Sequence, residues 1–95
     1  MKEYVDQEIR DAVHALGDLY VRITRDEMAD ASDEEMFSRV RSGVYRWGSP
    51  REIAEAAHLA GRIAALAKLA SVYLIKLSPR TEELVRWADV MKEEA

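Results

Sequence analysis

The chain of 95 residues is 48% apolar and 34% charged, with a net charge of −4. This composition excludes a disordered or collagen-like chain and suits one globular domain, spanning residues 1–95. The absence of cysteine excludes disulfide bonds, thiolate nucleophiles and zinc–thiolate sites. The first residues are too acidic for a secretory signal peptide, and no apolar run reaches the roughly 20 residues of a membrane span. We therefore predict a cytoplasmic protein that does not enter a membrane.

The charged residues are distributed unevenly along the chain. Residues 1–38 contain four basic and eleven acidic side chains, whereas residues 39–51 contain four arginines and no acid. A globally acidic protein repels nucleic acid at long range, but a local basic segment can still bind phosphate or an acidic partner.

The first predicted element is an amphipathic helix over residues 3–25. Its apolar residues recur at the spacing of one helical face, and they are Val5, Ile9, Ala12, Val13, Leu16, Leu19, Tyr20 and Ile23. Asp11, His14 and Asp18 fall on the opposite, polar face.

A turn near residues 26–32 separates this helix from a second one. Ser32 and Glu35 have the spacing of a capping box. The apolar stripe then continues through Met36, Phe37, Val40, Val44 and Trp47. Gly48 stands where a helix commonly ends.

Two Ser-Pro dipeptides punctuate the rest of the chain. Ser49-Pro50 and Ser78-Pro79 each combine a capping residue with proline at the first helical position. They bracket a predicted third helix of roughly 27 residues, with turns near 48–49 and 77–78. A fourth helix, from Pro79 to about Lys92, is expected to bury Leu84, Trp87, Ala88 and Met91.

Together these elements predict an all-α, single-domain four-helix bundle with two long and two short helices. Between Ile53 and Ile75 only Glu55, Arg62 and Lys68 carry a full charge. A helix that is apolar on several sides is usually packed on several sides, so we predict that the third helix is central and largely buried. Its expected buried residues are Ile53, Ala57, Ala60, Ile63, Ala64, Leu66, Ala67, Ala70, Tyr73 and Leu74.

The search for catalytic and metal-binding motifs yields one pair of residues. Glu55 and His58 have the i, i+3 spacing of carboxylate-bridged metal sites in helical bundles, but such sites need a second motif and further inward carboxylates. A surface ladder of Glu55, His58 and Arg62 is the simpler interpretation. No nucleophile–base pair or phosphate-binding glycine loop is present. We predict no metal, no cofactor and no enzymatic activity.

The segment "REIAEAAHLAGRIAALAKL" allows a second interpretation of the third helix. Ile53, Ala54, Ala57 and Leu59 fall where the first helix and turn of a DNA reader place apolar residues, and the segment resembles a helix-turn-helix. The resemblance implies a break in the helix near His58 and a regulator that binds DNA. Arg62 would be the one base-reading side chain on its recognition face.

The basic segment "RVRSGVYRWGSPR" interleaves Arg39, Arg41, Arg46 and Arg51 with Tyr45 and Trp47. Arginine and aromatic residues together can hold single-stranded nucleic acid, and they are also enriched in protein-interface hot spots. A third interpretation places Trp47 in the core and pairs the arginines with the acidic segment 26–35. The sequence leaves all three open.

One flank of the third helix favours a protein partner. Its residues are Ala54, Ala57, Gly61, Ala64, Lys68 and Ile75, and small side chains allow another helix to approach closely. The second and fourth helices are too short to cover this flank. We therefore predict a self-associating interaction module, most simply a homodimer. A structural or adaptor subunit of a larger viral or archaeal assembly fits this description. Nucleic-acid binding through the segment Arg39–Arg51, as a helix-turn-helix-like regulator or a single-strand binder, is the alternative function.

Overall fold

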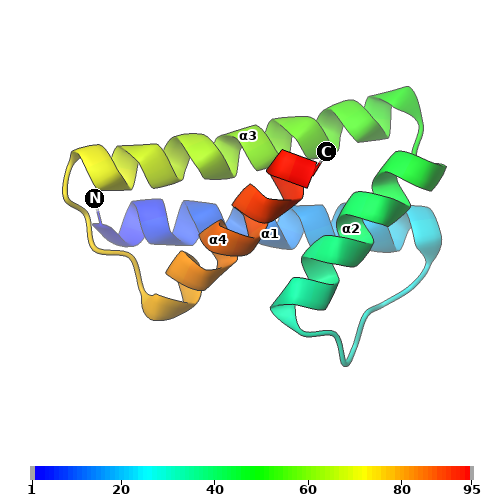
Figure 1. Ribbon diagram of the computed structural model, residues 1–95, viewed down its shortest axis with the longest axis horizontal. Coiled ribbons are helices and arrows are strands. Elements are labelled where there is room, and N and C mark those ends of the chain that lie inside the picture. The colour runs from blue at the N-terminus through cyan, green and yellow to red at the C-terminus, as the bar shows by residue number, and fades with distance from the viewer. Residues whose placement is uncertain (1, 95) are drawn as a thin grey trace.

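The computed structural model describes residues 2–94, with the side chains of residues 3–90. Four helices account for most of this range: α1 (Lys2–Thr24), α2 (Asp33–Trp47), α3 (Pro50–Val72) and α4 (Pro79–Glu94). Figure 1 shows α3 running along α1, with α2 and α4 crossing α1 obliquely. The predicted all-α architecture with two long and two short helices is confirmed.

The helix starts follow the predicted capping signals. Ser49 accepts a hydrogen bond from the Glu52 N–H, and the Glu52 carboxylate accepts one from the Ser49 N–H, which completes a capping box. Ser78 likewise accepts from the Thr81 N–H at the start of α4. At α2, Ser32 accepts from the Glu35 N–H as predicted, while the Glu35 carboxylate instead accepts from the Ser32 hydroxyl at 3.4 Å.

The end of α3 differs from the prediction. The helix stops at Val72 after 23 residues, several residues before the predicted turn at 77–78. Leu74 adopts the left-handed region at φ 54°, and the Ile75 N–H bonds the Ala70 carbonyl at 2.8 Å. This pattern is a Schellman-type helix end, which normally uses glycine at the left-handed position. The chain then turns back toward the N-terminal part of α1.

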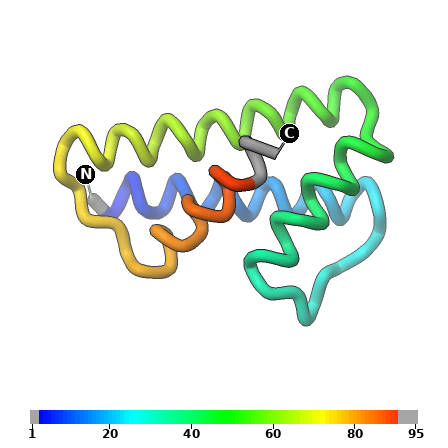
Figure 2. Tube along the Cα trace, viewed as in Figure 1, coloured from blue at the N-terminus to red at the C-terminus, as the bar shows by residue number. Residues whose placement is uncertain are grey.

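α1 contributes most of the core, whereas the third helix, α3, is less buried than predicted. The side chains that α1 buries are Val5, Asp6, Ile9, Ala12, Val13, Leu16, Leu19 and Tyr20. Both α1 and α3 contact each of the other three helices, and the two long helices pack most extensively against each other. The tube view of Figure 2 shows the same arrangement, with α2 and α4 lying across α1.

Within α3 only Ile63, Leu66 and Ala70 of the ten residues predicted to be buried are fully so. Ile53, Ala60, Ala64 and Ala67 are half-buried, while Ala57, Tyr73 and Leu74 are exposed. Alanine explains much of this error, because it favours helices without requiring burial. In α4, Leu84 and Ala88 are buried and Trp87 half-buried as predicted, while the side chain of Met91 lies outside the described residues.

A glycine sets the crossing of α1 and α2. A Cβ added to Gly43 would lie 2.5 Å from the Tyr20 ring, so the two helices approach closely at this point. The Tyr20 hydroxyl donates to Asp26 at 2.8 Å, and the Arg39 guanidinium lies 3.6 Å from the same carboxylate. Burial and the hydrogen bond to Asp26 raise the Tyr20 pKa. The end of α1, the connection and α2 are thereby joined.

A buried carboxylate joins α4 to α1. Asp6, 7% exposed, accepts hydrogen bonds from the Ser78 N–H at 2.7 Å and from the Thr81 hydroxyl at 2.9 Å, and Arg10 lies 3.1 Å from it. Burial alone would raise the Asp6 pKa, but these hydrogen bonds and Arg10 together lower it. The start of α4 is therefore fixed by a side chain 72 residues earlier in the chain.

Candidate functional site

The outer face of α3 is the face that points away from α1. Six residues form it, at spacings of three and four, and we call them the α3 ridge: Ala54, Ala57, Gly61, Ala65, Lys68 and Val72. All six are exposed. Four of them belong to the predicted flank, whose remaining members Ala64 and Ile75 are half-buried. Exposed helix faces are usually polar, whereas Lys68 is the one charged residue of the α3 ridge.

Gly61 lies in the middle of the α3 ridge and has no role in the packing of the chain itself. A Cβ added to Gly61 would meet no atom within 4 Å, in contrast to Gly43 and Gly48, where it would collide with Tyr20 and with the Val44 carbonyl. A glycine inside a helix costs about 1 kcal/mol relative to alanine. The fold therefore gives no reason for glycine at this position.

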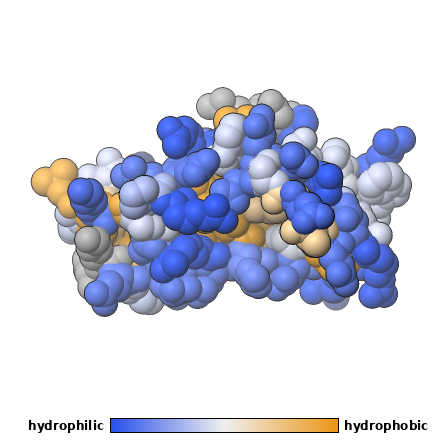
Figure 3. Space-filling view, turned by 90° about the horizontal axis from the view of Figure 1, so that it is seen from below, coloured by the Kyte–Doolittle hydropathy of each residue, from blue (hydrophilic) through white to orange (hydrophobic). Residues whose placement is uncertain are grey.

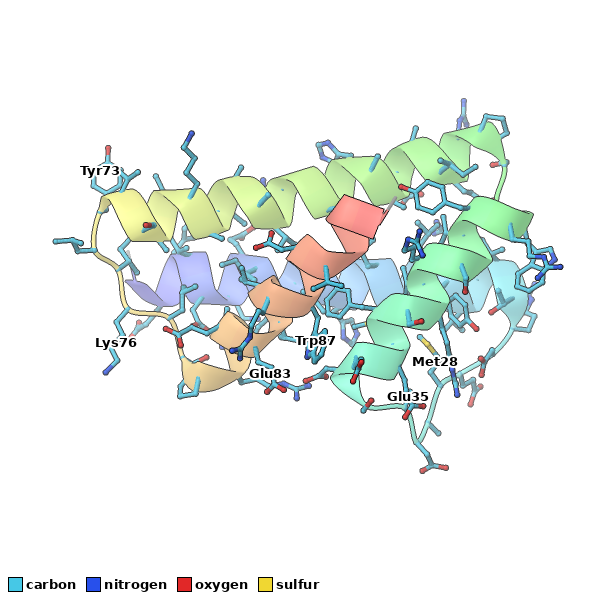
Figure 4. The ribbon with its side chains drawn as sticks, in the orientation of Figure 1. Met28, Glu35, Tyr73, Lys76, Glu83 and Trp87 are labelled. Carbon is cyan, nitrogen blue, oxygen red and sulfur yellow. The ribbon has the colours of Figure 1, made fainter. Side chains whose placement is uncertain are left out.

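The α3 ridge ends at Val72, and two more large apolar residues, Tyr73 and Leu74, follow directly after the helix. Val72, Tyr73 and Leu74 are all exposed, and Leu74 is 91% exposed. Figure 4 shows Tyr73 projecting from the end of α3, away from α1. Figure 3 shows strongly apolar atoms at this end of the molecule. Sequence reasoning predicted Tyr73 and Leu74 to be buried because it extended the helix through them.

Ion pairs with α1 border the ridge on one side. Glu55 accepts from Arg22 at 3.0 Å, and Arg62 donates to Glu8 at 2.5 Å. The hydrogen bond to Glu8 also raises the Arg62 pKa. Glu55 and Arg62 therefore reach across to α1 instead of forming the predicted ladder with His58, which is exposed. Within the described part of the chain no group of three His, Asp or Glu side chains could hold a metal ion.

The helix-turn-helix interpretation requires a turn that α3 does not contain. The helix runs without interruption from Pro50 to Val72 and passes through His58. The two short helices of a DNA reader cannot form from one continuous helix. That interpretation of the segment is wrong.

The basic segment contains a second exposed surface. Trp47 is 61% exposed, and the Arg46 guanidinium lies 5.2 Å from the centre of its ring. Tyr45 and Arg51 are also exposed. Arg39 does pair with Asp26 and Glu35 of the acidic segment, as the third interpretation expected. That interpretation also placed Trp47 in the core, and in this respect it is wrong. The reason is that α2 ends at this residue, and the chain turns at Gly48.

A shallow groove of about 400 Å³ lies between α1, the connection 25–32 and the start of α4. Val13, Gly17 and Met28 contribute apolar surface to it. Its rim carries mixed charges, and Arg80 there donates to Asp33 at 2.6 Å. This groove could not be predicted from the sequence, because its residues come from distant segments.

Comparison with known proteins gives no relative from which a function could be transferred. No protein-family model matches the chain. No curated protein and no solved structure is significantly similar to it. None of the helices within residues 2–94 combines the length and hydropathy that a membrane crossing requires.

Proposed function

We propose that the protein is a non-catalytic interaction module that self-associates through the α3 ridge and its apolar end. The observation that carries this proposal is the exposed ridge itself, with Gly61 at its centre. Small side chains allow a second helix to pack near the lower end of the usual 8–10 Å axial separation. A second copy of the chain offers the same small residues in the same spacing.

Residue spacing makes the α3 ridge suitable for a two-fold dimer. In an isologous interface, if residue i of one copy meets residue j of the second, then residue j of the first also meets residue i of the second. In an antiparallel pairing with the axis near residue 63, Ala54 faces Val72 of the second copy and Gly61 faces Ala65. Small residues thus oppose small residues at the centre, and the exposed Val72 meets an alanine near each end.

The conformation of Leu74 supports a role for the apolar end. A bulky residue in the left-handed region costs roughly 1–2 kcal/mol, and Leu74 recovers none of this by burial, since it is 91% exposed. The end of α3 uses a left-handed residue here, where glycine would carry no strain, and strained residues often belong to functional surfaces. Covering Leu74 with a second copy would give its side chain a packing role.

Size-exclusion chromatography with light scattering tests the proposal. We expect the wild-type chain to elute at twice its 10.8 kDa mass at micromolar concentration. Gly61→Leu should shift it to the monomer, because the larger side chain separates the two helices. Leu74→Gly should raise the stability of the monomer by about 1 kcal/mol, by relieving the left-handed strain, while weakening the dimer.

Gly17→Leu is the matched control, because Gly17 is also a helical glycine with no atom within 4 Å of an added Cβ but lies on α1. It should leave the mass of the dimer unchanged. Helix content measured by circular dichroism should be similar in all three variants. A wild-type chain that remains a 10.8 kDa monomer at high micromolar concentration would refute the proposal.

A further inference from the structure

Three helix ends meet at the end of the molecule opposite Leu74. They are the end of α1, the end of α2 and the start of α3, which lie together in Figures 1 and 2. The Arg22–Glu55 pair joins α1 to α3 there, and Gly48 lies against Ile23. We call the exposed residues Arg25, Tyr45, Arg46, Trp47 and Arg51 the arginine–aromatic end.

The arginines of this end are available to a ligand. Within the described residues Arg25, Arg46 and Arg51 form no ion pair. Nearby carboxylates are already engaged, since Glu55 binds Arg22, Glu52 caps α3, and Asp26 accepts from Tyr20. The end therefore presents three guanidinium groups that no described carboxylate pairs with, beside two exposed aromatic rings.

We infer that the arginine–aromatic end binds single-stranded nucleic acid. Arg46 lies over the Trp47 ring, while Trp47 remains 61% exposed. A base can stack on the ring where Arg46 does not cover it, and the guanidinium groups can contact the adjacent phosphates. Stacking combined with backbone charge is the usual chemistry of single-strand binding without sequence preference.

A protein partner is less favoured by these residues. An acidic peptide could pair with the same arginines, but it would leave the open surface of Trp47 without a planar group to stack on. The net charge of −4 repels any polyanion at long range, so binding should be weak and limited to low salt. This inference does not rest on the proposed dimer: the two surfaces share no residue, and only Arg51, three positions before Ala54, lies next to the α3 ridge.

Fluorescence anisotropy with labelled 15-nucleotide oligo-dT and oligo-rU provides the test. We expect a dissociation constant in the micromolar range at 50 mM salt, weakened about 20-fold at 200 mM if three phosphates are neutralised. Trp47→Ala should weaken binding at least about fivefold, and Trp47→Phe should restore part of the loss. Arg46→Ala/Arg51→Ala should reduce the salt effect to about threefold.

The matched control is Lys76→Ala/Arg86→Ala, which removes the same charge elsewhere, with Lys76 on the α3–α4 connection in Figure 4. This control should bind as the wild type does. Circular dichroism of each variant verifies that the helices persist. The inference is refuted if neither oligonucleotide binds at 50 mM salt, if the control weakens binding as much as the arginine pair, or if a poly-glutamate peptide binds in place of the oligonucleotides.

Discussion

At the scale of single residues, the glycines separate internal packing from open surface. Gly43 and Gly48 are required by the chain itself, because a Cβ at either would collide with Tyr20 or with the Val44 carbonyl. Gly17 and Gly61 have open space around them. The sequence singles out Gly48 by its place at a helix end, whereas only the packing of α1 against α2 distinguishes Gly43 from Gly17 and Gly61.

This distinction predicts opposite effects of the same substitution. Gly43→Ala should destabilise the fold by about 1–2 kcal/mol, because the clash with the Tyr20 ring outweighs the gain in helix propensity. Gly17→Ala should stabilise it by about 0.5–1 kcal/mol, because propensity acts there without a clash. Urea denaturation of the two variants beside the wild type measures both effects. Equal stabilisation by both substitutions would contradict the close approach at Gly43.

At the scale of elements, the capping residues and the stripe of α1 were predictable, while the end of α3 was not. Ser49 and Ser78 act locally, so their spacing to Glu52 and Thr81 is visible in the sequence. The early end of α3 depends on the return of Ser78 to Asp6, a contact across 72 residues. Local patterns favour a longer helix through Tyr73 and Leu74, and the tertiary contact overrides them.

The Asp6 contact makes the docking of α4 depend on pH. Asp6→Asn should cost about 1.5–3 kcal/mol at pH 6, because hydrogen bonds to an ionised acceptor are lost. The folded-state pKa of Asp6 is lowered, so its contribution is complete above the unfolded pKa of about 4 and is lost as pH falls through the folded value. The difference in unfolding free energy between wild type and Asp6→Asn should therefore shrink below pH 4.

Denaturation at pH 6 and near pH 2.5 measures this difference. A Trp47→Phe background leaves Trp87 of α4 as the single tryptophan, so its fluorescence reports the position of α4. Asp18→Asn is the control, since Asp18 lies exposed on the polar face of α1 and its substitution should have little effect. A pH-independent difference would show that the Asp6 carboxylate does not hold α4.

At the scale of the whole molecule, the sequence placed four of the six flank residues on an exposed face but overestimated how much of the third helix is buried. Both outcomes have the same physical origin. Ala54, Ala57 and Ala65 have small side chains that are compatible with burial and with exposure. An alanine-rich helix can therefore lie at the centre of a bundle or at its surface. The larger side chains of α1 decide the matter, because burying Ile9, Leu16 and Leu19 stabilises more than burying alanines.

The orientation of the proposed dimer follows from the one charge on its ridge. A parallel two-fold pairing would bring Lys68 against Lys68 of the second copy, whereas the antiparallel pairing with its axis near residue 63 places it opposite position 58, beside Ala57 of the second copy. Because the chain contains no cysteine, single cysteines report orientation without background. Oxidation of Ala54→Cys mixed with Val72→Cys should yield a disulfide between the two variants.

Neither variant should cross-link to itself in an antiparallel dimer. At 1.5 Å per residue the two copies of position 54 would lie about 27 Å apart, far beyond the roughly 7 Å between Cα atoms that a disulfide can span. Gly17→Cys, on α1 and away from the α3 ridge, serves as the control that should join neither variant. Self-cross-linking of Ala54→Cys and of Val72→Cys would mean that the helices run parallel, with the two Lys68 side chains forced to bend away from each other.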